Sequence, residues 1–217
     1  MVKPLYSDAG SGVIFNLAGE IQIGPDVLPE GVILLPINKQ AQNIVLPSGS
    51  KLAGIRFHPA IGYGVLGQHY QKPTLLLPEY DQLYDLDQIY SELRMQNNHD
   101  KQIDALYLWA QRNLTVPHLI PSSLKRVLEC IEQEEALGQL NEHVALSQRQ
   151  IERLFKRWLG VTPKHYQRIL RIKKAVYFLR QHKKVNLADV SLQFGFSDQA
   201  HMTREFRAIA STTPAQI

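Results

Sequence analysis

Two stretches near the carboxyl end of the chain repeat one pattern of residues. Each holds an arginine two residues before a phenylalanine, at Arg153 and Phe155 and again at Arg204 and Phe206, and a proline follows eight residues after that phenylalanine. The second copy, residues 195–206, reads GFSDQAHMTREF, in which the glycine suits a tight turn and the Ser-Asp pair suits a helix cap. A turn followed by a helix with basic residues on one face is typical of a helix-turn-helix unit. We therefore predict two such units in tandem.

The charge of the chain is distributed unevenly. Residues 1–120 carry 8 Lys and Arg against 11 Asp and Glu, a net charge of −3, whereas residues 121–217 carry 16 against 9, a net charge of +7. A basic half beside a mildly acidic half indicates that the carboxyl-terminal half meets a polyanion. Charge alone is a weak indicator, because many solvated helices are also basic.

The carboxyl-terminal half has the apolar spacing and the caps of an all-helical domain. We expect a supporting helix at 137–144, a recognition helix capped by Ser147, a long helix from 163 to about 182 capped by Thr162, and a second supporting helix at 187–194. A helix of about 20 residues spans roughly 30 Å, close to the ~34 Å pitch of DNA. One chain is therefore expected to place two recognition helices in successive major grooves.

The amino-terminal half has the punctuation of a small antiparallel sheet. Short apolar runs between 12 and 58 are separated by glycine and proline turns, and helical spacing follows at 81–95 and 101–114. The fold class is therefore predicted to be α+β, with a β-rich domain with helices at its end over 1–115 and an all-helical domain over 118–217.

The carboxyl-terminal residues resemble the AraC-type transcription regulators, the arabinose-operon regulator family. The resemblance covers about the last 95 residues and is specific, because several fixed spacings agree. Its positions in this sequence are Ser147, Ile151, Arg153, Phe155, Lys156, Gly160, Val161, Pro163, Arg171, Ala175, Leu179, Gly195, Phe196, Asp198, Met202, Arg204, Phe206 and Pro214. The sequence departs from the family pattern at Asn141, where a small residue is usual, and at Ser211, where a glycine is usual.

The first 115 residues resemble, more loosely, a small cupin-like sensor domain. The phrases that carry this resemblance are VIFNLAG at 13–19 and GIRFHP at 54–59. The resemblance implies a partial β-barrel that senses a small molecule or dimerises.

The family positions, together with helix geometry, imply which side chains meet DNA. Base contacts are expected from Arg149, Glu152, Arg153, Ala200, His201 and Arg204, with Glu205 as a further candidate. Backbone contacts are expected from Ser147, Gln148, Gln150, Lys156, Arg157, Gln199, Thr203 and Arg207. An arginine can pair with O6 and N7 of guanine, which is worth about 1–3 kcal/mol of base discrimination. Glu152 either accepts from a cytosine amine or orients Arg153, and a solvated surface face is the alternative for all of these residues.

Motifs for catalysis or metal binding are not found in the sequence. Cys130 is the only cysteine and lies in an apolar helical stretch, so we interpret it as a small buried side chain rather than a reactive thiol. The eight histidines show no paired spacing, and His58 and His69 lack a placed carboxylate, so neither a metal nor a cofactor is predicted. No nucleotide-binding or hydrolase fingerprint occurs, and we predict that the chain is not an enzyme.

These observations predict a cytoplasmic, sequence-specific regulator of transcription that binds double-stranded promoter or operator DNA. RNA polymerase, a small-molecule effector and a second copy of the chain are further expected partners, and a membrane is not. An alternative from another class is a protein-interaction or antagonist module that kept the fold and lost DNA binding. A metal-dependent small-molecule enzyme in the β-rich domain is a third, weaker hypothesis.

Overall fold

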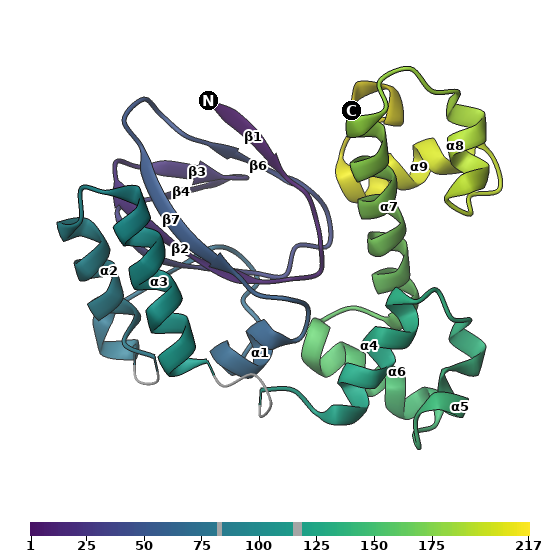
Figure 1. Cartoon of the computed structure of the whole chain (residues 1–217), viewed down its shortest axis with the longest axis horizontal. Helices are drawn as coiled ribbons and strands as arrows, with labels where there is room; N and C mark the ends of the chain where they lie inside the picture. Colours follow the sequence, from purple (N-terminus) through teal and green to yellow (C-terminus); the bar gives the residue numbers. More distant parts are fainter. Residues whose placement is uncertain (82–83, 115–118) are drawn as a thin grey trace. The chain divides into compact units, whose positions relative to one another are not determined.

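The computed structural model describes residues 1–81, 84–114 and 119–217 of the chain, which forms two compact units (Figure 1). The first unit contains Met1–Pro4, Gly10–Ile37 and Asn43–Ile120, and the second contains Leu5–Ala9, Asn38–Gln42 and Pro121–Ile217. The predicted boundary between the domains, which falls within 115–118, lies outside the described residues. In the part of the chain that the structure describes, no helix is both long and apolar enough to cross a membrane.

Antiparallel strands build two four-stranded sheets in the amino-terminal part of the chain. One sheet has the order β1 (Val2–Leu5), β6 (Gln42–Val45), β3 (Ile21–Ile23) and β4 (Asp26–Leu28). The other has the order β7 (Lys51–Arg56), β2 (Gly12–Ala18), β5 (Gly31–Leu35) and β8 (Thr74–Leu76). Strand β2 is central in the second sheet, because Val13 lies opposite Leu34 of β5 and opposite Ile55 of β7. The predicted antiparallel β-rich domain is thus confirmed.

The core of the first unit lies between one sheet and two helices. Helices α2 (Leu86–Met95) and α3 (His99–Asn113) pack beside β2 and β7 (Figure 1). Phe15 and Leu93 are fully buried between them, and the indole N–H of buried Trp109 donates to the carbonyl oxygen of Tyr84 at 2.8 Å. The short helices α1 (Ile61–Leu66) and η1 (Pro78–Tyr80) complete the described elements of this unit.

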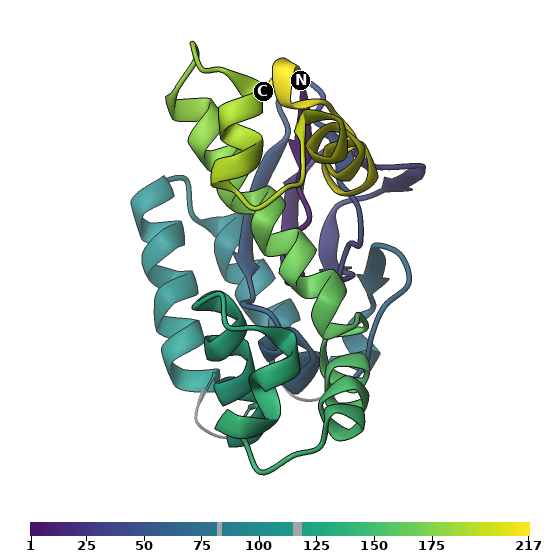
Figure 2. The same cartoon turned by 90° about the vertical axis from the view of Figure 1, so that its right-hand side faces the viewer.

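The second unit is helical. Its elements are α4 (Ser122–Glu132), η3 (Leu137–Gln139), α5 (Leu140–His143), α6 (Gln148–Leu159), α7 (Pro163–Gln181), α8 (Leu187–Gln193), α9 (Gln199–Ala210) and η4 (Pro214–Gln216). Figure 2 shows α7, in green, running from the group α4–α6 to the group α8–α9. Fully buried aromatic side chains come from three of these helices: Phe155 from α6, Tyr166 from α7 and Phe206 from α9. The helical unit thus has apolar core residues in α7 and in the last helix of each group.

Two helical predictions need correction. The supporting helix expected at 137–144 is divided into η3 and α5, and Gly138, which disfavours an α-helix by about 1 kcal/mol relative to alanine, lies in the 3₁₀ turn. The helical spacing of the apolar residues in the long helix predicts that Arg168 and Arg171, which lie off the apolar stripe, face solvent. Both are only half-exposed, because they contact α9 and the turn before it, as described below.

Candidate nucleic-acid interface

The first helix-turn-helix unit consists of α5 and α6, and its second helix begins at a capping box. The Ser147 hydroxyl accepts from the backbone N–H of Gln150 at 3.4 Å, while the Gln150 side-chain oxygen accepts from the Ser147 backbone N–H at 2.8 Å. This reciprocal pair satisfies two backbone donors at the start of the helix. The helix ends at Gly160, whose left-handed conformation (φ 66°) is one that glycine adopts without strain. The predicted cap of the first recognition helix is confirmed.

The second unit consists of α8 and α9 and follows the same plan. The Asn186 side chain caps α8 by accepting from the Ala188 N–H at 2.9 Å. Gly195 turns the chain with φ 71°, and an Asp198 carboxylate oxygen caps α9 by accepting from the His201 backbone N–H at 2.6 Å. This hydrogen bond is the main reason that the pKa of Asp198 is lowered. Both recognition helices are therefore set by polar caps at their amino-terminal ends.

The outer face of α6 carries most of the predicted contacts of the first unit. Arg149, Glu152 and Arg153 are exposed, at the spacing that places side chains on one helix face. Within the described residues these three side chains form no hydrogen bond and no ion pair. The opposite face, with Ile151 and Phe155, is buried. The helix thus presents polar and charged groups on a face that its apolar packing leaves open.

The outer face of α9 is arranged similarly. Ala200, Arg204 and Arg207 are exposed, whereas Met202 and Phe206 are fully buried beneath them. Arg204 and Arg153 occupy equivalent positions in the two repeats, two residues before the buried phenylalanine. The equivalence expected from the sequence is therefore present in the packing of both units.

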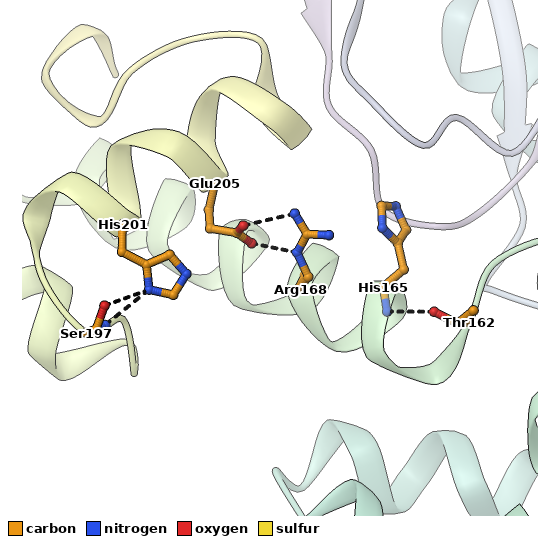
Figure 3. A network of polar contacts seen from close by, with 6 residues as sticks. All are labelled: Thr162, His165, Arg168, Ser197, His201 and Glu205. Atoms are coloured by element: carbon orange, nitrogen blue, oxygen red, sulfur yellow. Dashed lines mark hydrogen bonds and ion pairs between the residues drawn. The ribbon is translucent and has the colours of Figure 1, made fainter.

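His201 is held in one tautomer by the turn before α9 (Figure 3). Its Nδ1 lies 3.2 Å from the backbone nitrogen of Ser197 and 3.0 Å from the Ser197 hydroxyl. Because a backbone N–H can only donate, Nδ1 acts as the acceptor and the neutral ring carries its proton on Nε2. An Nε2–H group can donate to a base acceptor or to a phosphate oxygen, and His201 is only half-buried.

Glu205 is committed to a partner within the domain. Its two carboxylate oxygens accept from Nε and Nη2 of Arg168 on α7 at 2.7 and 2.9 Å (Figure 3). This two-pronged pair lowers the pKa of Glu205, chiefly through the hydrogen bonds from Arg168. Beside it, the Arg171 guanidinium lies 5.5 Å from the ring centroid of Phe196. Glu205, considered as a base contact from the sequence, is therefore better described as a group that fixes α9 to α7.

The residues predicted to contact the DNA backbone lie mostly at the surface of the helical unit. Exposed side chains are found at Ser147, Gln148, Gln150, Lys156, Arg157, Gln199 and Arg207, and Thr203 is half-buried. Some of these groups already have internal roles, the Ser147 hydroxyl of the capping box among them. The side-chain oxygen of Gln150 belongs to the capping box, and the Thr203 hydroxyl donates to the Gln199 carbonyl at 2.9 Å. A DNA phosphate would therefore accept a hydrogen bond from the side-chain NH₂ of Gln150. At Thr203, it would compete with the Gln199 carbonyl oxygen for the hydroxyl proton.

Arg168 and Arg171 are the residues whose role sequence reasoning missed. Their helical spacing indicated only that they lie off the apolar stripe of α7. Their contacts with α9 and with the turn before it depend on how the chain folds back onto α7 after α8. The spacing of residues within α7 does not predict that arrangement.

Comparison with known proteins agrees with this geometry. Residues 140–217 match a family described as "Helix-turn-helix domain". The HTH-type transcriptional regulator ArgR of Pseudomonas aeruginosa is 33% identical over 86 residues, which are 40% of this chain and 26% of that protein. The HTH-type transcriptional activator RhaS of Escherichia coli is 37% identical over 76 residues, 35% of this chain and 27% of that protein. The chain thus spans about a quarter of the length of these relatives, which are named as transcription regulators and not as enzymes.

Solved structures extend the likeness of the fold to the whole chain. ToxT from Vibrio cholerae aligns with a TM-score of 0.53 at 10% identity, over 100% of this chain and 96% of that one. A second ToxT structure, bound to (E)-4-(8-methylnaphthalen-1-yl)but-3-enoic acid, aligns with a TM-score of 0.53 at 10% identity, over 99% and 96% of the two chains. At this identity the likeness shows the fold, a β-sheet part followed by a helical part.

Proposed function

We propose that this chain, whose carboxyl-terminal domain belongs to the AraC-type helix-turn-helix family, is a sequence-specific transcription regulator whose helices α6 and α9 read adjacent major grooves. The observation that carries the proposal is the repeated geometry. Two capped helices bury their apolar faces and leave Arg153 and Arg204 exposed at equivalent positions. The 19 residues of α7, at 1.5 Å each, separate its ends by about 28 Å, which suits successive grooves on one side of a duplex.

The binding free energy is expected to have two sources. Lysine and arginine side chains neutralise phosphates and release counterions, which makes the affinity depend on salt. Base discrimination then comes from Arg149 and Arg153 on α6 and from His201 and Arg204 on α9. Glu152 has no partner among the described side chains, so its carboxylate is open to accept from a cytosine amine.

A selection from random duplexes at two salt concentrations tests this proposal. We expect an enriched motif with two blocks about one helical turn apart. On the enriched duplex, Arg204→Ala is expected to weaken binding about 5- to 150-fold, which corresponds to roughly 1–3 kcal/mol, and to relax base preference in one block only. Arg153→Ala is expected to do so in the other block.

Lys125→Ala is the charge-matched control. Lys125 is exposed on α4, outside both recognition helices, and its substitution removes the same unit of charge. It should change the affinity for all duplexes slightly and leave the selected motif unaltered. Equal effects of Lys125→Ala and Arg204→Ala on the affinity would contradict base reading by α9. An affinity that does not depend on salt would contradict DNA binding through phosphate contacts.

The protein-interaction alternative rested on sequence departures that the fold accommodates. Asn141 is exposed on α5, so it buries no amide, and Ser211 adopts the left-handed conformation usual for the glycine it replaces (φ 53°). Among the described residues, no contact favours the alternative over DNA binding. Its distinguishing result would be a protein partner whose binding Arg153→Ala and Arg204→Ala leave unchanged, together with no enriched duplex.

Control by an effector is a further part of the proposal. The ToxT structure that shares the fold holds an organic acid with an aromatic tail, and an acid of this kind is the first ligand class to test on this chain. An effector shifts regulation only if it binds two arrangements of the protein with different affinity. Operator affinity should therefore change with added acid, and that change should saturate. A fixed affinity over the whole titration would exclude this class of effector.

A second copy of the chain and RNA polymerase are the remaining proposed partners. Helix α3 exposes Ile103 and Tyr107 one helical turn apart, and a second copy is expected to cover them. Sedimentation should show a dimer that Ile103→Glu dissociates. Transcription in vitro with purified RNA polymerase then tests this second partner. With the selected duplex placed upstream of a promoter, the assay shows whether the chain activates or represses the polymerase.

A further inference from the structure

Three side chains with metal-binding donors meet at the junction of α4 and α5. The thiol sulfur of Cys130, a carboxylate oxygen of Glu135 and an imidazole nitrogen of His143 all lie within 4.8 Å of one another. His143 Nε2 is 2.8 Å from Glu135 Oε2. Within residues 1–81, 84–114 and 119–217, this is where such donors gather in a group of three. The predicted burial of Cys130 is confirmed at 1% exposure, but its neighbours were not foreseen.

The end of α4 brings Cys130 and Glu135 together. The Glu135 N–H donates to the Cys130 carbonyl at 3.1 Å, and the Glu134 N–H donates to the Ile131 carbonyl at 3.1 Å. With Glu134 in the left-handed region (φ 67°), these bonds form a Schellman motif. The side chains at the positions of Cys130 and Glu135 in this motif usually form an apolar contact. Here the pair is a thiol and a carboxylate, and the His143 imidazole lies next to both of them.

The burial of Cys130 disfavours a charge on its thiol in the absence of a cation. The sulfur also lies beside the half-buried Glu135 carboxylate. The His143 imidazole contacts the same carboxylate, with Nε2 at 2.8 Å from Glu135 Oε2. A thiolate beside that carboxylate would bring a second negative charge, which only a cation of higher charge could balance.

The donor set matches a divalent transition metal. Zinc takes thiolate sulfur at about 2.3 Å and imidazole nitrogen or carboxylate oxygen at about 2.0–2.2 Å. A tetrahedral ion with those bonds separates its ligand atoms by roughly 3.3–3.6 Å, so atoms that already lie within 4.8 Å need only small side-chain movements. Thiolate, carboxylate and neutral imidazole together also balance the double charge of the ion. The thiolate ligand excludes magnesium and calcium, which bind through oxygen.

We propose that Cys130, Glu135 and His143 bind one zinc ion, with a fourth position open to water. The site would join the end of α4 to the end of α5, and α6 packs against α4. Resting on the proposed function, the consequence is that zinc fixes the placement of α6 and so raises the affinity of the first half-site. Metal control would then act on one of the two recognition helices.

Cobalt titration of the full-length protein tests the site directly, without DNA. We expect one equivalent of Co²⁺ to produce a thiolate-to-cobalt charge-transfer band, and Zn²⁺ to displace it. Because Cys130 is the only cysteine, that band and the rate of thiol alkylation both report on this position alone. Zinc should slow the alkylation at least about tenfold, since coordination occupies the sulfur.

Variants outside the fully buried core keep the test independent of folding. His143→Gln alters a residue with an exposed side chain, so the core is retained. The variant should lower the affinity for the metal at least about tenfold. Glu135→Gln should do the same, whereas Glu142→Gln, the exposed acid beside His143, should not. An absent charge-transfer band, or equal cobalt affinity in wild type, His143→Gln and Glu142→Gln, would overturn the site.

A separate measurement tests the consequence for DNA. Operator affinity is expected to be about fivefold or more higher with zinc than with a chelator, and His143→Gln should remove that difference. Equal affinities within twofold would overturn control of α6, while the cobalt titration still decides whether the metal site exists. Failure of DNA binding altogether would refute the proposed function and would leave the titration result standing.

Discussion

The ion pair between Arg168 and Glu205 makes a quantitative prediction about how the second recognition helix is held. The Glu205 side chain is 14% exposed and the Arg168 side chain 35% exposed, and two hydrogen bonds of 2.7 and 2.9 Å join them. Hydrogen bonds to charged groups contribute about 1.5–3 kcal/mol, whereas fully exposed pairs contribute about 0–1 kcal/mol. Because Arg168 is partly hydrated, we expect a coupling free energy between these extremes, about 1–2 kcal/mol.

A double-mutant cycle with Glu205→Gln and Arg168→Gln measures this coupling. Unfolding in urea is followed by the fluorescence of Trp158 on α6, in a Trp109→Phe background that removes the other tryptophan. Each single variant should lower the free energy of unfolding, and the double variant should cost about 1–2 kcal/mol less than the sum of both. Glu152→Gln, which removes an exposed carboxylate without a described partner, is the control and should change little.

The pH dependence of the same variants gives a second check. The pKa of Glu205 is lowered in the folded state, so its contribution is complete above the unfolded value of about 4.3 and is lost as pH falls through the folded pKa. The deficit of Glu205→Gln relative to wild type should therefore shrink below about pH 4.3. Single-variant effects that add within about 0.5 kcal/mol, or a deficit that is constant down to pH 3, would refute the assigned role of the pair.

Three further changes test local features of the helical unit, each by urea unfolding. Ser147→Ala removes the capping box of α6 and should cost about 1 kcal/mol; no loss would contradict the cap. Ser211→Gly relieves a left-handed residue at φ 53° and should stabilise by up to about 1 kcal/mol, whereas Ser211→Ala should not. Tyr166→Phe deletes a fully buried hydroxyl that donates to Glu132 Oε1 at 2.9 Å and should cost about 1–3 kcal/mol; an unchanged midpoint would show that water replaces this donor.

Local chemistry explains which parts of the fold the sequence predicts. Strands β2 and β5 coincide with two of the apolar runs predicted between 12 and 58, because glycine or proline lies next to their ends and their interiors are apolar. The starts of α6, α7 and α9 follow from Ser147, Thr162 and Asp198, whose side chains each accept a backbone N–H two or three residues on. These features need only a few neighbouring residues, so a single sequence contains them.

The features that sequence reasoning missed depend on residues far apart in the chain. Strands β3 and β4 have three residues each, too few for periodicity to show, and their pairing is fixed by the turn at Gly24. The meeting of Cys130 with His143 needs α5 to fold back against α4, and no ligand spacing in the sequence announces it. DNA contacts stay predictions for the same reason, because the geometry that selects them includes the duplex.

The two proposed recognition helices are attached to the rest of their domain by different chemistry, and under the proposed function this difference would matter for regulation. Helix α9 is tied to α7 by the Arg168–Glu205 pair, whose charges persist across the neutral pH range. Helix α6 packs on α4, whose end carries the thiol, carboxylate and imidazole cluster, and the charge of that cluster changes with a bound ion. A signal acting at the cluster would therefore change the first half-site while leaving the second intact. The expected outcome is graded control, in which α9 keeps the protein on its operator and α6 decides how tightly it is held.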